Sequence, residues 1–202
     1  MQGFCDCHKA TEQAILCIKL DIVFGITGIF TSQNRLIPKY YHMPLSLSIQ
    51  SRLRHQHETL AELIKGLTEE QLKHRANPAK WSAFENIVHL ASYQPVFYKR
   101  LQLIEQQDNP AFERYVADND PVFQQYAERS LKELLENLTT ERFLINNHIF
   151  QLSETVLRRH GSHPLYGSFS ISQWSDFFLL HEAHHLFTIF MLTAATRKSF
   201  QH

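Results

Sequence analysis

The sequence predicts an all-α protein: a bundle of four amphipathic helices that begins near residue 43. Four long segments repeat apolar residues with the 3.6-residue period of a helix, and none alternates as a strand would. Capping boxes, in which Ser or Thr is followed three residues later by Glu or Gln, mark helix starts at Thr68 and Ser82. Long helices with one apolar stripe each bury that stripe by packing together, so the segments predict a four-helix bundle.

The ends of these helices are marked by particular residues. The predicted helices cover about residues 45–66, 82–106, 120–149 and 170–197. Gly66 ends the first, and Pro95 is expected to kink the second. Asp120 is an N-cap and Pro121 the first helical residue of the third. The connections that lead into the last two helices are each more than ten residues long. Such long connections permit a crossover, so a simple up-down-up-down order is not required.

Residues 1–42 differ in composition from the rest of the chain. They contain all three cysteines and three of the six glycines. Their apolar stretch, residues 14–30, is slightly short for a membrane span, has Lys19 and Asp21 near its middle, and is followed by no small-residue cleavage site. We therefore expect residues 1–42 to be an N-terminal extension and residues 43–202 to form the domain.

Charge and cysteine content exclude some classes of function. The chain has 20 Lys plus Arg and 20 Asp plus Glu, so its formal charge is zero. Nucleic acids and anionic membranes both select clustered basic residues, so we expect neither as a partner. The domain has no cysteine for disulfides or thiolate ligands, which is typical of a cytoplasmic protein.

Three histidines form the best candidate for a site. His181 and His185 are four residues apart, so they lie on one face of the last predicted helix and can bind one metal ion. His89 lies on the apolar stripe of the second helix. Facing helices in a bundle are about 8–10 Å apart, a gap that opposed histidines can fill around a metal. Three neutral imidazoles on a divalent cation would leave a position open for water or substrate.

Two other metal sites share parts of this pattern. The segment from His181 to His185 matches the H-E-x-x-H motif of zinc proteases, in which Glu182 would be the general base. Zinc proteases usually take a third ligand downstream, and here no Asp or Glu follows, so we assign Glu182 a flanking role. A di-iron bundle needs a second Glu-x-x-His, whereas Glu85 and His89 are four apart.

Three further histidines have weaker claims to a role in the site. His57 lies on the stripe of the first helix and could line a pocket there. His160 and His163 precede the last helix in a segment that contains Gly161 and Pro164, and we expect both to be solvated.

Taken in order, three motifs resemble the DinB/YfiT-like superfamily of metal-dependent enzymes. They are Leu67-Thr68-Glu69-Glu70-Gln71-Leu72, Trp81-Ser82-x-x-Glu85-x-x-x-His89-Leu90 and His181-x-x-x-His185-Leu186. The resemblance spans residues 43 to about 197. It implies an up-down-down-up four-helix bundle in which His89, His181 and His185 hold a divalent cation. Pro95 in the second helix and residues 1–42 depart from the pattern.

The resemblance also implies a range of activities. Relatives include thiol S-transferases, a thiol-dependent isomerase and many proteins called hydrolases. We therefore expect a small-molecule substrate, a low-molecular-weight thiol as a candidate co-substrate, and Zn, Ni, Mn or Fe as the metal. A cation that lowers the pKa of bound water or thiol suits both hydrolysis and thiol transfer. The alternative is a non-catalytic bundle that binds metal or forms a homodimer, with which the aromatic-rich helices are compatible.

Overall fold

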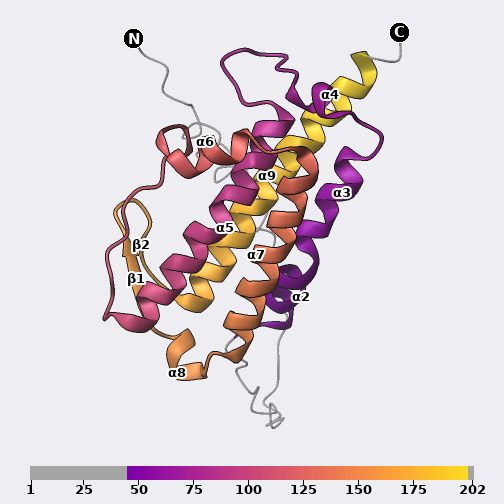
Figure 1. The fold of residues 1–202 in the computed structure, drawn as a ribbon. Helices are drawn as coiled ribbons and strands as arrows, with labels where there is room; N and C mark the ends of the chain where they lie inside the picture. The colour runs from indigo at the N-terminus through magenta and orange to yellow at the C-terminus, as the bar shows by residue number, and fades with distance from the viewer. Residues whose placement is uncertain (1–44, 200–202) are drawn as a thin grey trace, which may run out of the picture. The chain divides into compact units, whose positions relative to one another are not determined.

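The computed structural model describes residues 45–199 (Figure 1). The expected extension, residues 1–42, lies outside the described residues, so the domain boundary stays a prediction. The helices are α2 (Leu47–His55), α3 (Thr59–Ile64), α4 (Glu69–Lys73), α5 (Ala83–Gln106), α6 (Pro121–Ala127), α7 (Leu131–Gln151), α8 (Glu154–Leu157) and α9 (Ile171–Ser199). Two 3-10 turns, η1 (Gln56–Glu58) and η2 (Ala117–Asn119), and two strands, β1 (His160–His163) and β2 (Gly167–Ser170), complete the structure.

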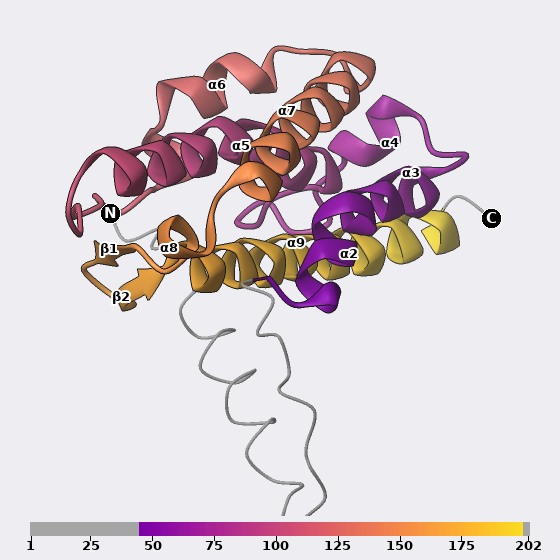
Figure 2. The same cartoon turned by 90° about the horizontal axis from the view of Figure 1, so that it is seen from below.

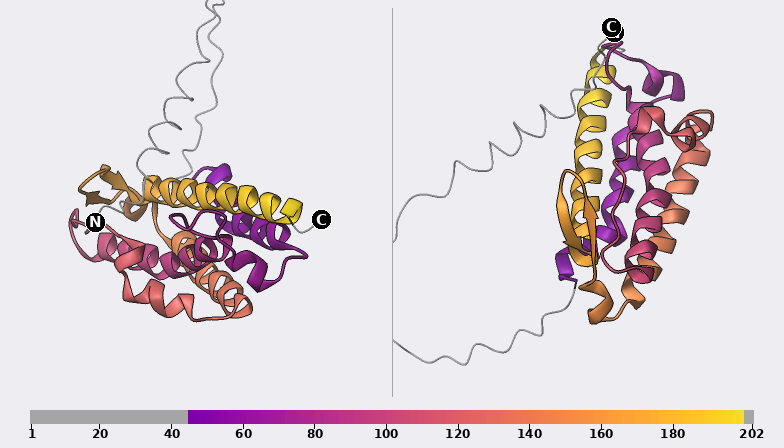
Figure 3. Two further views of the ribbon diagram at one scale, coloured as in Figure 1. Left: turned by 90° about the horizontal axis from the view of Figure 1, so that it is seen from above. Right: turned by 90° about the vertical axis from the view of Figure 1, so that its left-hand side faces the viewer.

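Four helical rods make up the bundle, and they confirm the expected topology. The rods are α2 with α3, then α5, α7 and α9 (Figures 1 and 2). The first and last run in one direction and α5 and α7 in the other, so the order is up-down-down-up. Because α5 and α7 are parallel, residues 107–130 must return along the bundle to start α7. The side view in Figure 3 shows this connection and the β1–β2 hairpin beside the rods.

Local capping explains where the rods begin, and it corrects one prediction. The third predicted helix, 120–149, is two helices, because Ser130 starts a new one. Its hydroxyl accepts from the Glu133 backbone N–H at 3.3 Å, and the Glu133 carboxylate accepts from the Ser130 N–H at 2.8 Å. The prediction of one helix was wrong because this capping box was overlooked. The Asp120 cap is confirmed: its carboxylate accepts from Val122 N–H at 2.7 Å.

The hairpin β1–β2 was not predicted, and it changes the environment of His163. Its antiparallel strands are four residues long, too short to give an alternating pattern. The indole N–H of Trp174 on α9 donates to the Gly161 carbonyl at 3.0 Å, which ties β1 to the bundle. His163 is therefore buried, contrary to the expectation of a solvated loop, whereas His160 is exposed.

A layer of polar side chains divides the core into two apolar clusters. One cluster includes Ile87, Leu134 and Ile189, and the other includes Phe97, Ile145 and Phe178. At the boundary between the two clusters, α7 contributes Arg142 and α9 contributes the segment 181–185, and His89 from α5 contacts that segment. Every residue of α5 from 86 to 94 is buried, so this helix is surrounded along that length. The candidate site thus lies in the interior of the bundle.

Helix α9 is apolar on its outer side as well as its inner side. By length and composition it is the one helix within residues 45–199 that could span a membrane, and 39% of its most apolar window is buried. A core helix of a bundle has the same composition. On its outer side Leu180 and Phe187 are 63% and 64% exposed.

Candidate metal centre

The structure brings together the three histidines that the sequence singled out. His89 projects from α5 towards His181 and His185, which occupy adjacent turns of the antiparallel helix α9. Their potential ligand nitrogens all lie within 4.8 Å of one another, and the Nε2 atoms of His89 and His181 are 3.1 Å apart. Nitrogens bonded at about 2.0–2.1 Å to a tetrahedral ion lie roughly 3.4 Å apart. The arrangement fits one ion with little side-chain adjustment.

Asn86, which the sequence reasoning missed, fixes the orientation of His185. The Asn86 amide N–H₂ donates to the Ser82 carbonyl at 2.8 Å, so the amide oxygen faces the imidazole, 2.8 Å from His185 Nδ1. With Nδ1–H donating to that oxygen, the lone pair of His185 is on Nε2. Asn86 precedes His89 by three residues, so a polar residue one turn from a candidate ligand was the available signal.

Burial keeps all three imidazoles neutral near pH 7. It is the main cause that lowers the pKa values of His89 and His185 well below the usual value, and neighbouring histidines lower them further. The pKa of His181 is lowered to about 4, again chiefly by burial. His89 and His185 are buried, whereas His181 is partly exposed. A neutral imidazole has the free lone pair that a metal requires, so protons do not compete for the site at neutral pH.

Glu182 is held in a buried ion pair and is not free to act at the histidines. Its carboxylate accepts from the Arg142 guanidinium on α7 and from Gln56 Nε2 at 2.9 Å. The side chains of Glu182 and Arg142 are each only 1% exposed. Arg142 donates further to Gln94 Oε1 at 3.2 Å. The zinc-protease interpretation needs this carboxylate beside the ligands, and its partners place it against α7 and η1 instead.

Arg142 was also missed by the sequence reasoning, although it left a signal. It is the single charged residue on the buried stripe of α7, between Leu138 and Ile145. A charge at such a position needs a buried partner of opposite sign. His57, which was expected to line a pocket, lies near Arg142. Burial and the Arg142 charge lower the pKa of His57. It lies outside the group of three histidines that could hold a metal.

The second carboxylate close in sequence to a ligand is also occupied. Glu85 accepts from the Ser82 backbone N–H at 2.8 Å as the acid of the predicted capping box. It also pairs with the Arg75 guanidinium, whose Nε lies 2.8 Å from Glu85 Oε2. Both acids close in sequence to the histidines therefore have partners elsewhere, so within residues 45–199 the donor set is the three imidazoles.

Aromatic rings surround the histidine cluster. Around His89, ring centroids lie at 5.2 Å for Trp81, 5.7 Å for Tyr93 and 5.9 Å for Tyr115. Tyr93 also lies 4.8 Å from the His181 ring. Burial raises the pKa of Tyr93, and it raises that of Tyr115 to about 12, so both phenols stay protonated. These two phenols can thus donate protons in hydrogen bonds, but neither is a ready base.

This donor set suits a divalent transition metal, because neutral imidazoles bind Zn, Fe, Ni and similar ions. Comparison with known proteins shows the family. The sequence profile of the DinB superfamily matches residues 52–189. The chain belongs to the DinB superfamily. The three histidines lie within the matched DinB region. The four rods of the bundle lie within this region or overlap it.

Among solved structures, this DinB protein is similar to YfiT from Bacillus subtilis. YfiT is described as a probable metal-dependent hydrolase with an unusual four-helix bundle topology. The match has a TM-score of 0.63 at 16% sequence identity and covers 84% of this chain and 94% of YfiT. At that identity the likeness concerns the fold. No curated protein matches the sequence.

Proposed function

We propose that this protein is a metal-dependent enzyme in which His89, His181 and His185 hold one divalent cation and a small molecule reacts beside it. The observation that supports this most is the convergence of three neutral imidazoles, with ligand nitrogens within 4.8 Å, in the polar layer of the bundle. A cation with three neutral ligands keeps its full charge, and when bound it would act as a Lewis acid that lowers the pKa of water or a thiol.

The protein's own residues would orient the site and supply hydrogen bonds. Asn86 keeps the Nε2 lone pair of His185 directed at the other two ligands. Tyr93, whose ring lies 4.8 Å from that of His181, stays protonated and can donate a hydrogen bond to a substrate oxygen. Glu182 and Glu85 are committed to Arg142 and Arg75, so neither is available as a general base.

That shortage of a base bears on the choice between a thiol and water as the nucleophile. A free thiol has a pKa near 8.5 and bulk water about 15.7, so a thiol needs much less activation. Thiol S-transfer is therefore the reaction that the residues around the site favour. Hydrolysis is the second candidate, supported by the similarity to YfiT, a probable metal-dependent hydrolase.

Metal analysis of the purified protein tests the proposal. We expect one divalent ion per chain and a severe loss of occupancy when His89, His181 or His185 is replaced by Ala. His184, which is exposed and lies about 100° round α9 from His185, is the matched control, and His184→Ala should keep the ion. Equal losses from His184→Ala and His181→Ala would show that the wrong histidines were paired.

The reaction class needs a separate assay on the metal-loaded protein. We expect consumption of a low-molecular-weight thiol in the presence of an electrophile, lost with chelator and restored by Zn, Ni, Mn or Fe. Turnover of esters or amides without thiol would favour hydrolysis. A native protein without stoichiometric metal would instead support a bundle that keeps its histidines for stability alone.

A further inference from the structure

Arg100 is a buried cation without an acidic partner in the part of the chain that the structure describes. It is 9% exposed and forms no ion pair within residues 45–199. Its guanidinium donates to the Tyr93 hydroxyl and to the Glu113 carbonyl, each at 3.0 Å. These contacts use two of the five N–H donors and neutralise no charge. The guanidinium also lies over the Phe112 ring, 5.2 Å from its centroid, which compensates burial of the charge only in part. Arg142 shows the usual solution, a buried carboxylate.

The position of Arg100 connects it to the candidate metal centre. Tyr93 lies between them: its ring centroid is 4.8 Å from that of His181, and its hydroxyl accepts from Arg100. Side chains on a helix lean towards its N-terminus, so Arg100 reaches back along α5 towards His89. One phenol ring therefore separates the guanidinium from the histidines.

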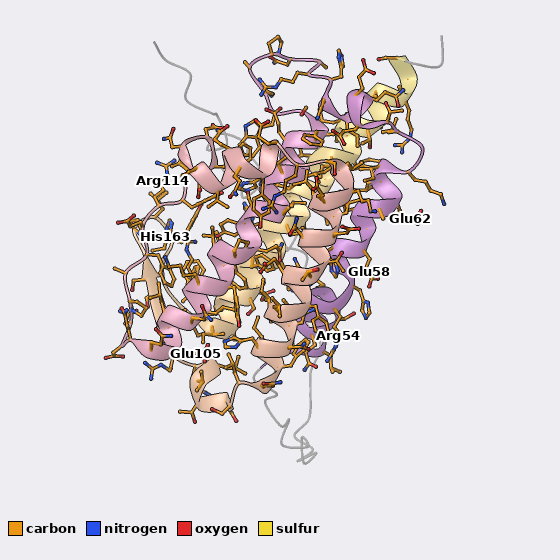
Figure 4. All side chains as sticks on the ribbon, viewed as in Figure 1. Arg54, Glu58, Glu62, Glu105, Arg114 and His163 are labelled. Atoms are coloured by element: carbon orange, nitrogen blue, oxygen red, sulfur yellow. The ribbon has the colours of Figure 1, made fainter. Side chains whose placement is uncertain are left out.

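A second cation, Arg114, acts on the same neighbouring residue as Arg100. The pKa of buried His163 is lowered chiefly by burial and further by the charges of Arg100 and Arg114. Figure 4 labels Arg114 and His163 on the flank of the bundle where residues 107–116 and the hairpin lie. Asp120, the acid that acts on nearby Tyr115, caps α6. Arg100 itself, buried and without a paired acid among the described residues, would attract an anion and disfavour a cation.

We propose that Arg100 binds a carboxylate group of the substrate while the reacting end of the same molecule lies at the three histidines. The proposal rests on the metal-dependent function proposed above. The planar guanidinium can bind a carboxylate through two parallel hydrogen bonds with its remaining donors, and a bound carboxylate would supply the missing counter-charge. The substrate class is thus a carboxylic acid. Its carboxylate and its reacting atom would lie on opposite sides of the Tyr93 ring.

Two hydroxamates that differ only at the far end can test this proposal on the Zn²⁺-loaded protein. Hydroxamates bind zinc whichever reaction the enzyme performs, and adipic acid monohydroxamate has a carboxylate where hexanohydroxamic acid has a methyl group. Calorimetry should show that the native protein binds the carboxylate-ended compound roughly 10- to 100-fold more tightly, as for a charge-assisted hydrogen-bonded pair. Arg100→Gln should abolish this preference at unchanged zinc content, and Arg100→Lys should keep part of it.

Arg114→Gln is the matched control, because Arg114 is an exposed cation on the same flank, and it should keep most of the preference. Equal affinity of the native protein for the two hydroxamates would overturn the proposal, and this measurement needs no variant. An Arg100→Gln protein that melts earlier but retains the preference would show that Arg100 only anchors residues 107–116. Failure to bind zinc would refute the proposed function itself, whereas zinc binding without preference refutes only the role of Arg100.

Discussion

Replacement of Glu182 by Gln should destabilise the fold strongly and leave the metal site intact. The substitution keeps the shape of the side chain but leaves Arg142, whose side chain is 1% exposed, without a counter-charge. Removal of one partner of a buried ion pair costs about 3–5 kcal/mol of unfolding free energy. In a domain of this size each kcal/mol shifts Tm by about 2–4 °C, so a loss on the order of 10 °C is expected.

Chemical and thermal unfolding of the metal-free protein would measure this effect. Glu154→Gln is the matched control, because Glu154 pairs with Arg158 at the surface, and its loss should change stability by less than about 1 kcal/mol. The double variant Glu182→Leu with Arg142→Met removes both charges and should recover much of the loss.

Two results would refute the reasoning. A cost below about 1 kcal/mol for Glu182→Gln would mean that the pair is not desolvated as the structure indicates. A variant of normal stability that binds metal but is inactive would make Glu182 a general base, in line with the zinc-protease motif, since loss of such a base typically costs about 10²- to 10⁴-fold in rate.

Three smaller perturbations test other contacts. Asn86→Leu removes the acceptor that orients His185 and should weaken metal binding roughly 10- to 100-fold in a chelator competition, with little change in fold. Gly161→Ala would place a Cβ 2.6 Å from the Phe112 ring, and thermal unfolding should show a loss of about 1–3 kcal/mol. The folded-state pKa of His163 is lowered, so stability should fall as pH drops below about 6.5, and His163→Gln should reduce that slope in urea titrations.

Long-period patterns made the bundle and its histidines predictable. The spacing of His181 and His185 fixes both side chains on one face of a helix whatever the tertiary structure, and His89 lies on a stripe that must be buried. The up-down-down-up order, in contrast, came from family resemblance, because the pattern of one helix says nothing about its neighbour's direction. The contact between Arg142 and Glu182 depends on that order and could not be derived from spacing.

Short-range features were predicted less well for a different reason. The strands β1 and β2 have too few residues for a period, and tertiary contacts such as that of Trp174 with Gly161 hold them in place. The break before α7 was readable, since Ser130 and Glu133 form a capping box like the one at Ser82. Continuity of the apolar stripe across residues 128–130 concealed it.

The distance along the chain between the facing histidines sets when the site can form. His89 and His181 are 92 residues apart, so α5 must wait for α9, the last helix of the bundle to be synthesised, before any nitrogen of one meets the other. Contacts of such separation form late, after the entropy of closing a long loop has been lost. An ion bound by these histidines would not template early folding; it would join α5 to α9 only after both helices are in place. Added metal should consequently slow unfolding and leave the rate of refolding almost unchanged.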